Sequence, residues 1–153
     1  RPYKKRKHVG TKRAIVSLVE RGGSVRSFHP PVADVNNVAQ IVRDNVARET
    51  RLHTDESKLY VGVGREFTAH ETVNHSAKEY ARGDITTNTI ETYFSVFKRG
   101  MRGTYQHCGE KHRHRYLAEF DFRYNNRSGF GGTDGERAGL AIKGIAGKRL
   151  TYR

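Results

Sequence analysis

The strongest constraint on the fold lies between Thr86 and Asn125, where the first half of the segment has the spacing of an amphipathic helix. Its apolar side chains recur four, three and four residues apart, which places them on one helical face: Ile90, Phe94, Phe97 and Met101. A polar, mostly charged stripe repeats this spacing one position later: Glu91, Ser95, Lys98 and Arg102. A carboxylate and a lysine therefore lie two turns apart on one side of the helix. This layout suits a metal ligand at one position and a phosphate contact at the other.

Glu91 also fits a purely structural role. Asn88-x-x-Glu91 resembles a capping box, in which the glutamate turns back to the start of the helix. Caps are far commoner than metal ligands, so this interpretation is favoured for Glu91 taken alone. The upstream stretch His53-Thr54-Asp55-Glu56 changes the balance, because Asp55 supplies a second acid 36 positions before Glu91.

The balance of charge points to a polyanionic partner. The 153 residues include 29 Lys and Arg against 16 Asp and Glu, which gives a formal net charge of +13. Seven of the first thirteen residues are basic, and two further basic groups follow: Lys98, Arg99, Arg102, Lys111, Arg113 and Arg115, then Lys143, Lys148, Arg149 and Arg153. Such patches attract phosphodiester backbones with little regard to base sequence. A ribosomal-type or merely soluble basic protein is the alternative.

The same composition limits other classes of protein. A chain of this length suits a single domain with a modest core. No run approaches the roughly 20 apolar residues of a membrane helix, and no signal peptide is recognisable. The single cysteine excludes an internal disulfide and fits a reducing cytoplasm. A weaker alternative is zinc binding by a cluster of potential ligands, two of which point to different helix faces: His107, Cys108, His112 and His114.

Local patterns predict an alternation of strands and helices. Residues 13–29 predict a β-hairpin, and 35–46 predict a helix with Asp34 as its N-cap. Residues 50–54 predict a strand that delivers Asp55 at its carboxyl end, where α/β proteins bind ligands. An ordinary Thr-Asp turn is the alternative there. The other expected elements are a short helix or loop at 59–67, a strand at 72–75, a flexible stretch at 81–84, a helix at 110–124 and a mobile, Gly-rich basic tail at 128–153.

Several segments, taken together, resemble a known protein family. They are H-T-D-E-S (53–57), H-E-T-V-N-H-S (70–76), E-Y-A-R-G-D (79–84), T-N-T-I-E (87–91), F-K-R-G-M-R-G-T-Y-Q-H (97–107), F-R-Y-N-N-R (122–127) and the closing G-K-R-L-T-Y-R (147–153). In content and order they resemble the catalytic domain of bacterial insertion-sequence transposases of the DDE type, of the ISXO-like group. The resemblance runs over nearly the whole chain.

The resemblance implies a fold and a reaction. The implied fold is α/β, a ribonuclease-H-like mixed sheet with flanking helices. The implied reaction is DNA strand cleavage and transfer, driven by three acids that bind two divalent ions, Mg²⁺ or Mn²⁺. By position, Asp55 matches the second acid, Glu91 the third, and Lys98 the basic residue seven places later. The metal ligands expected here are thus Asp55 and Glu91, and the expected DNA contacts are Lys98, Arg99, Arg102, Lys111 and Arg115.

One departure from the family pattern bears on activity. In the family the first acid lies in a strand shortly before a basic segment, and this sequence begins with such a basic segment, at residues 1–12. We therefore expect residues 1–153 to be an N-terminally truncated catalytic domain that lacks the first, central strand of the sheet. The family's N-terminal zinc ribbon is missing too. Without the shared carboxylate, little or no catalysis by this chain is expected. The vacant strand position predicts a gap, a rearranged sheet or a partner strand.

Three classes of function are compatible with these observations. The first is a DDE transposase domain or its remnant, acting on double-stranded DNA at transposon ends and target sites. The second is a basic DNA-binding module without catalysis, and the third is another nuclease or resolvase of related fold. No membrane is involved in any of them. The first class implies a bacterial cytoplasmic, nucleoid-associated location and is compatible with a homo-oligomer.

Overall fold

The structure, a computed structural model, describes residues 14–79, 81–106 and 108–148. These residues form two units. One consists of the described residues up to Val16 together with Phe28–Thr87, and the other of Ser17–Ser27 together with the described residues from Asn88 onward. The predicted basic segment at 1–12 and the end of the predicted tail, 149–153, lie outside the described residues.

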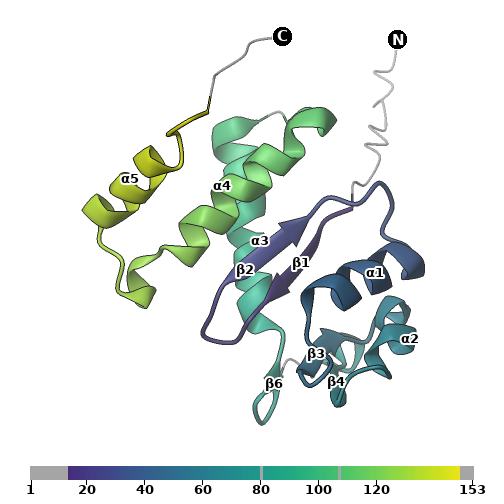
Figure 1. Cartoon of the computed structure of the whole chain (residues 1–153). Coiled ribbons are helices and arrows are strands. Elements are labelled where there is room, and N and C mark those ends of the chain that lie inside the picture. The colour runs from purple at the N-terminus through teal and green to yellow at the C-terminus, as the bar shows by residue number, and fades with distance from the viewer. Residues whose placement is uncertain (1–13, 80, 107, 149–153) are drawn as a thin grey trace, which may run out of the picture. The chain divides into compact units, whose positions relative to one another are not determined.

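Two parallel strands form the framework of the first unit. β3 (Arg51–Asp55) and β4 (Ala69–Val73) pair in parallel, with Asp55 opposite Val73 at their carboxyl ends (Figure 1). A parallel pair needs a crossover connection. Here a 3₁₀ turn and a short helix make it, and both fall in the predicted helix or loop: η1 (Lys58–Tyr60) and α2 (Val61–Gly64). The strand predicted to deliver Asp55 is confirmed. The strand predicted at 72–75 is found as β4, which begins earlier, at Ala69, and ends earlier, at Val73.

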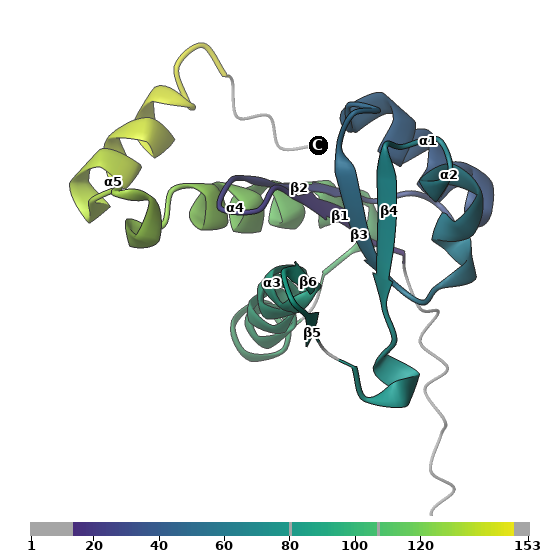
Figure 2. The same cartoon turned by 90° about the horizontal axis from the view of Figure 1, so that it is seen from below.

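Helix α1 (Val35–Asn45) confirms the helix predicted from its apolar spacing. Asp34 caps this helix, because its side chain accepts the backbone N–H of Asn37 at 2.8 Å. Figure 2 shows α1 and α2 on the same side of the β3–β4 pair. An ion pair ties α1 to the crossover, with Arg43 Nη2 2.6 Å from Glu66 Oε1. The buried side chains of this layer are Val38, Ala39, Val42, Val63 and Phe67.

The stretch before the central helix, expected to be flexible, forms a tight hairpin instead. β5 (Ala81–Arg82) and β6 (Ile85–Thr86) pair antiparallel across a two-residue turn. Gly83 in this turn has φ +62°, a left-handed conformation that glycine adopts without steric cost. The Arg82 side chain then donates to the carbonyl oxygen of Thr72 on β4 at 3.2 Å, so the hairpin is tied to the parallel pair.

In the second unit, helix α3 (Asn88–Gly100) confirms the predicted central helix, but its buried face is shifted. Tyr93 and Phe97 are buried, at 2% and 7% exposed. The other predicted core residues are only half-buried: Ile90, Phe94 and Met101. The inner face therefore runs through Tyr93, Phe97 and Gly100, four and three residues apart. The apolar pattern omits Tyr93 because its ring carries a polar hydroxyl, although most of its surface is apolar. The polar stripe is exposed, as predicted: Glu91, Ser95, Lys98 and Arg102.

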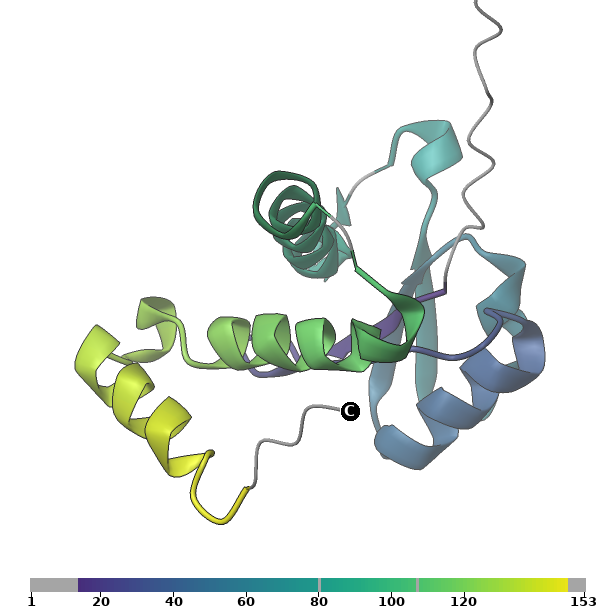
Figure 3. The same ribbon diagram turned by 90° about the horizontal axis from the view of Figure 1, so that it is seen from above.

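Helix α3 continues into a π-helical turn, η3 (Met101–Tyr105), and packs on α4 (Arg113–Asn125), which confirms the second predicted helix. The packing uses aromatic rings that meet edge to face: Phe97 with Phe120 at 5.0 Å between centroids, and Tyr105 with Tyr116 at 4.9 Å. Figure 3 views α3 nearly along its axis and α4 from the side, so the two helices cross. Gly100 lies against Phe120, since a Cβ built on Gly100 would be 2.4 Å from Phe120 Cζ.

A β-hairpin formed by β1 (Val16–Val19) and β2 (Val25–Phe28) confirms the hairpin predicted at 13–29. Its turn is closed by backbone hydrogen bonds from Glu20 N to Ser24 O at 3.0 Å and from Gly23 N to Glu20 O at 2.9 Å. The two strands are thus held in register by their own turn, and one edge of β2 is left for another element.

Helix α4 occupies that edge of β2. Asn125 Oδ1 accepts the Val25 N–H at 2.7 Å, and Asn125 Nδ2 donates to the Val25 carbonyl oxygen at 2.9 Å. This pair of bonds is the one that a neighbouring antiparallel strand would make. One turn earlier, Asp121 Oδ2 accepts the Ser27 N–H at 2.7 Å. Residues four apart on a helix rise about 6 Å, and residues two apart on a strand about 6.8 Å, so one helix face serves both positions.

The expectation of a mobile tail is wrong for its middle part. Asp134–Lys143 form helix α5, which starts with a capping box between Thr133 and Glu136. The Thr-x-x-Glu signal for this helix was present in the sequence. No residue of α5 is buried.

The structure confirms the α/β class. Its described strands form three two-stranded sheets: β1–β2, β3–β4 and β5–β6. The ribonuclease-H-like sheet and the missing central strand stay predictions, because β1 and β3 fall largely in different units.

Gly100→Ala should destabilise the second unit by about 1–3 kcal/mol, because the new methyl group would overlap the buried Phe120 ring. Gly103→Ala is the matched control, since nothing lies within 4 Å of a Cβ at Gly103. Removing this exposed helical glycine should instead raise stability by up to about 1 kcal/mol. Urea denaturation followed by circular dichroism measures both changes. Equal effects of the two substitutions would contradict the close approach of Phe120 to Gly100.

Candidate functional site

Asp55 is presented at the carboxyl end of the parallel strand pair. It is the last residue of β3, and its side chain is exposed. Its Oδ1 accepts the Ser57 backbone N–H at 3.0 Å, which turns the chain away from the strand immediately after the carboxylate. The carboxyl ends of parallel strands are where open α/β sheets bind ligands. Asp55 therefore combines an open position with a conformation fixed by its own turn.

Glu56 joins the loop after β3 to the loop after β4. Its carboxylate accepts the His75 N–H at 2.7 Å, the Ser76 N–H at 3.2 Å and the Ser76 hydroxyl at 2.6 Å. The Ser76 hydroxyl, followed by the His75 amide, lowers the pKa of Glu56 from 4.5 to about 2. Glu56 is therefore a bound, ionised carboxylate that fixes the loop beside Asp55. No local sequence signal marks this role of Glu56, because its donors lie in a loop about 19 residues away in the chain.

His75 and Tyr60 lie in the segments that follow the two parallel strands. His75 begins the 3₁₀ turn η2 (His75–Ala77) after β4, and its Nε2 lies 3.1 Å from Thr87 Oγ1. Burial raises the pKa of Tyr60, and the negative charge of Asp55 adds to the effect. The phenol therefore remains protonated next to the carboxylate at neutral pH.

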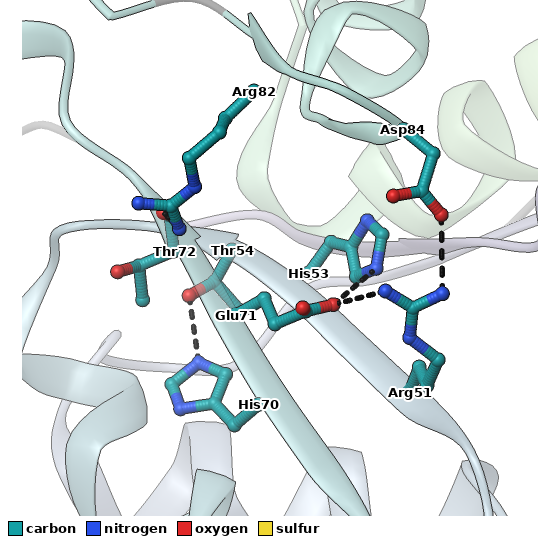
Figure 4. Close-up of polar contacts among 8 residues, drawn as sticks. All are labelled: Arg51, His53, Thr54, His70, Glu71, Thr72, Arg82 and Asp84. Carbon is teal, nitrogen blue, oxygen red and sulfur yellow. Dashed lines mark hydrogen bonds and ion pairs between the residues drawn. The ribbon is translucent and has the colours of Figure 1, made fainter.

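A network of ion pairs braces the strands that carry Asp55 (Figure 4). Glu71 Oε2 on β4 lies 2.6 Å from Arg51 Nη2 and 3.2 Å from His53 Nε2, both on β3. Arg51 Nη1 also reaches Asp84 Oδ2 at 3.1 Å, in the β5–β6 turn. Arg51 thus joins three strand segments through one guanidinium group. These pairs are partly exposed, so they orient the strands more than they stabilise them.

The opposite face of the strand pair carries a second polar contact. Thr54 Oγ1 lies 2.9 Å from His70 Nε2. His70 is packed against Gly64, where a Cβ would be 2.0 Å from the His70 Nδ1 atom. Burial lowers the pKa of His70, so its ring is neutral at physiological pH. His70 is therefore a half-buried histidine that packs on Gly64 and contacts Thr54.

Glu91 and Lys98 lie on the exposed side of α3. Glu91 is in the first turn and Lys98 in the last, and both side chains are exposed. Seven residues are nearly two full turns, so the two side chains point the same way about 10 Å apart along the axis. The first turn of a helix also favours a carboxylate through the aligned backbone dipoles.

The remaining predicted DNA contacts are also exposed. Arg99 lies in the last turn of α3, Arg102 lies in η3, Lys111 lies in η4 (Glu110–His112) and Arg115 is in the first turn of α4. Arg113, which lies in the same basic run, is buried at 8% exposed. The Arg113 side chain therefore lies in the interior of the unit, whereas the other four basic side chains are exposed to solvent.

Asp55 and Glu91 belong to different units, so their convergence on one metal site stays a prediction. Within the described part of the chain, no group of three or more His, Cys, Asp or Glu side chains is arranged to hold a metal ion. Cys108 Sγ lies 3.6 Å from the Gly109 carbonyl oxygen, and His107 is outside the described residues. No described helix has the length and apolar run needed to cross a membrane.

Comparison with known proteins gives one match. The family model described as the ISXO2-like transposase domain matches residues 1–125. The match includes both units' candidate residues and ends at the last residue of α4, so α5 lies beyond it. Neither the curated proteins nor the solved structures give a match to this chain.

Protonation of Glu56 should release the loop at His75 and Ser76 only in strong acid. Its folded pKa is depressed, so its stabilising contribution is complete above the ordinary value of 4.5 and is lost as the pH falls through about 2. In NMR titrations the amide shifts of His75 and Ser76 should therefore follow a midpoint near 2. Glu56→Gln should speed hydrogen exchange of these two amides, whereas Glu49→Gln, outside this loop, should not. A midpoint near 4.5 would contradict the clamp.

Proposed function

Because the chain belongs to the ISXO2-like transposase domain family, we propose that it serves DNA transposition through metal-dependent strand cleavage and transfer. The observation that carries the proposal is the family match over residues 1–125, which spans Asp55, Glu91 and Lys98. The exposed position of Asp55 at the end of the parallel strands supports the same assignment. So does the exposed Glu91–Lys98 stripe of α3.

We propose Asp55 and Glu91 as ligands of divalent ions. Both are exposed carboxylates, and hard oxygen donors of this kind suit Mg²⁺ or Mn²⁺. Two such ions, when bound, would activate the attacking oxygen and stabilise the leaving one. Lys98 would contact a DNA phosphate as a mobile point charge. Arg99, Arg102, Lys111 and Arg115 would add backbone contacts that carry no sequence information.

We further propose that the polypeptide of residues 1–153 cleaves DNA weakly when it acts alone. Asp55 and Glu91 match the second and third acids of the family pattern, and no acid of the sequence stands in a motif that matches the first. A ribonuclease-H-like sheet would place a further strand next to β3. This is supported by β3 having only β4 as a hydrogen-bonded neighbour within the described residues.

A second candidate function is DNA binding without catalysis. It is favoured by the +13 net charge and by the exposed basic residues of α3, η3 and α4. The effect of Mn²⁺ distinguishes the two functions. A catalytic domain should bind Mn²⁺ through Asp55 and Glu91, whereas a binding module should retain its DNA affinity with or without Mn²⁺.

Mn²⁺ titrations of the 153-residue chain, followed by electron paramagnetic resonance, test the proposed ligands. Asp55→Asn and Glu91→Gln should each weaken Mn²⁺ binding by at least roughly tenfold, because each removes one ionised ligand. Glu91→Gln also separates the two interpretations of Glu91, since glutamine still serves a capping box. Lost Mn²⁺ affinity at unchanged thermal stability supports the ligand role. Unchanged Mn²⁺ affinity in both variants would contradict it.

A nicking assay on supercoiled DNA tests the proposal of weak cleavage. We expect little Mn²⁺-dependent nicking by the wild-type chain, since the first acid of the family pattern has no match in it. Asp55→Ala serves as the control for contaminating nuclease. Robust nicking that disappears in Asp55→Ala would overturn this part of the proposal.

Lys98→Ala should weaken binding to all DNA sequences alike and reduce the slope of log K against log salt by about one, because one phosphate contact is lost. Arg123→Ala is a control with the same loss of formal charge, since Arg123 Nη2 already pairs with Glu119 Oε1 at 2.7 Å. Fluorescence anisotropy at several salt concentrations measures both slopes. A larger effect of Arg123→Ala would place the DNA contact elsewhere.

A further inference from the structure

The carboxylate of Asp121 receives hydrogen bonds from two other elements of the second unit. Asp121 Oδ2 accepts the Ser27 backbone N–H at 2.7 Å, and Oδ1 accepts the Ser27 hydroxyl at 2.7 Å. Oδ1 also accepts the Tyr93 hydroxyl at 2.5 Å. The Ser27 and Tyr93 hydroxyl oxygens are themselves 2.9 Å apart, which closes the group. One side chain of α4 therefore joins β2 to α3.

Tyr93 is the member of this group that belongs to α3. It is 2% exposed, and its ring meets Phe94 and Tyr124 edge to face, each at 5.6 Å between centroids. Burial, followed by the hydrogen bond to Asp121, raises the pKa of Tyr93 well above its usual value. The phenol is therefore protonated at all physiological pH values and always available as a donor to Asp121. Both ends of the Tyr93 side chain are thus fixed, the ring by packing and the hydroxyl by the carboxylate.

The position of Tyr93 links this group to the proposed metal ligand. Tyr93 and Glu91 are two residues apart on α3, so they point about 200° apart around the helix axis. Because a helix turns as a rigid body over so short a distance, contacts that fix Tyr93 on the inner side also fix the direction of Glu91 on the outer side. The other inner contact with ring packing, Phe97 on Phe120, lies one turn further from Glu91. The Asp121 bond thus fixes the inner face of α3 within one turn of the proposed ligand.

We propose that Tyr93 and Asp121 are positioning residues for Glu91, which set the direction of its carboxylate through the rotation of the first turns of α3. The inference rests on the proposed function, because it gives Glu91 the role of a metal ligand. Groups that orient metal ligands without touching the metal commonly change affinity by one or two orders of magnitude. Asp121 itself is engaged by three donors and is not a ligand in this assignment.

The chain supplies a matched control for this proposal. Tyr105 donates its hydroxyl to Glu119 Oε1 on α4 at 2.6 Å, so it makes the same type of bond from the turn that follows α3. Tyr93→Phe and Tyr105→Phe each remove one hydroxyl from a tyrosine–carboxylate bond and keep the ring. Only Tyr93 lies within one helical turn of Glu91. A merely structural role of these bonds predicts similar consequences for both substitutions.

The experiment measures two properties of the full 153-residue chain. The first is hydrogen exchange of the amides in the early turns of α3, without metal. The second is Mn²⁺ affinity, with Glu91→Ala as the reference for loss of the ligand. Tyr93→Phe should speed exchange at these amides and weaken Mn²⁺ binding by roughly tenfold. Tyr105→Phe should leave both unchanged, and Asp121→Asn, which keeps the shape of the side chain, should follow Tyr93→Phe.

The outcomes separate this inference from the proposed function. Equal exchange in Tyr93→Phe and Tyr105→Phe would overturn the positioning role, whatever the metal result. Faster exchange in Tyr93→Phe with unchanged Mn²⁺ affinity, while Glu91→Ala loses it, would overturn it as well. If Glu91→Ala leaves Mn²⁺ affinity unchanged, the ligand role of Glu91 fails, and the positioning role fails with it for a different reason.

Discussion

The second unit depends on the docking of helix α4 against the edge of strand β2. A strand edge presents backbone groups that must find partners when they are covered. Asn125 supplies both partners of Val25, and Asp121 supplies the partner of Ser27, so two side chains make the bonds that a neighbouring strand would otherwise make. The match works because one helical turn is nearly as long as two residues of a strand. Losing one of these acceptors would leave a partly buried amide without its bond, at a cost of about 1–3 kcal/mol.

In both units, a carboxylate held by several hydrogen bonds braces the element that carries a candidate ligand. In the first unit, Glu56 binds the loop after β4 and follows Asp55 directly in the chain. In the second, Asp121 binds Tyr93, two positions from Glu91. In each pair the candidate ligand is exposed, and the other acid is held by several donors. An exposed carboxylate on a braced backbone loses less entropy on binding a cation than one on a mobile loop.

The family assignment gives these arrangements a common purpose. The chain belongs to the ISXO2-like transposase domain family, and the reaction proposed for it requires acids held at fixed positions relative to DNA. Exposed basic residues lie on α3, η3 and α4, and in the proposed function they would contact the DNA backbone without selecting its sequence. The ion pairs of Arg51 with Glu71 and Asp84 hold the strands that present Asp55. In the proposed function, DNA binding and chemistry would therefore use different residue types, basic on the helices and acidic at a strand end and a helix start.

The sequence by itself determined the local elements and the candidate residues. Apolar spacing gave α1, α3 and α4, and motif order gave the family, because both depend on residues close together in the chain. Only the tertiary structure decided which carboxylates act as braces. Glu56 and Asp121 look like ordinary surface acids in the sequence, since their partners lie 19 and 94 residues away. The inner face of α3 was likewise decided by Asp121, which turns the polar end of Tyr93 into a buried contact. A spacing pattern counts apolar side chains and cannot register a hydroxyl that finds its acceptor on another helix.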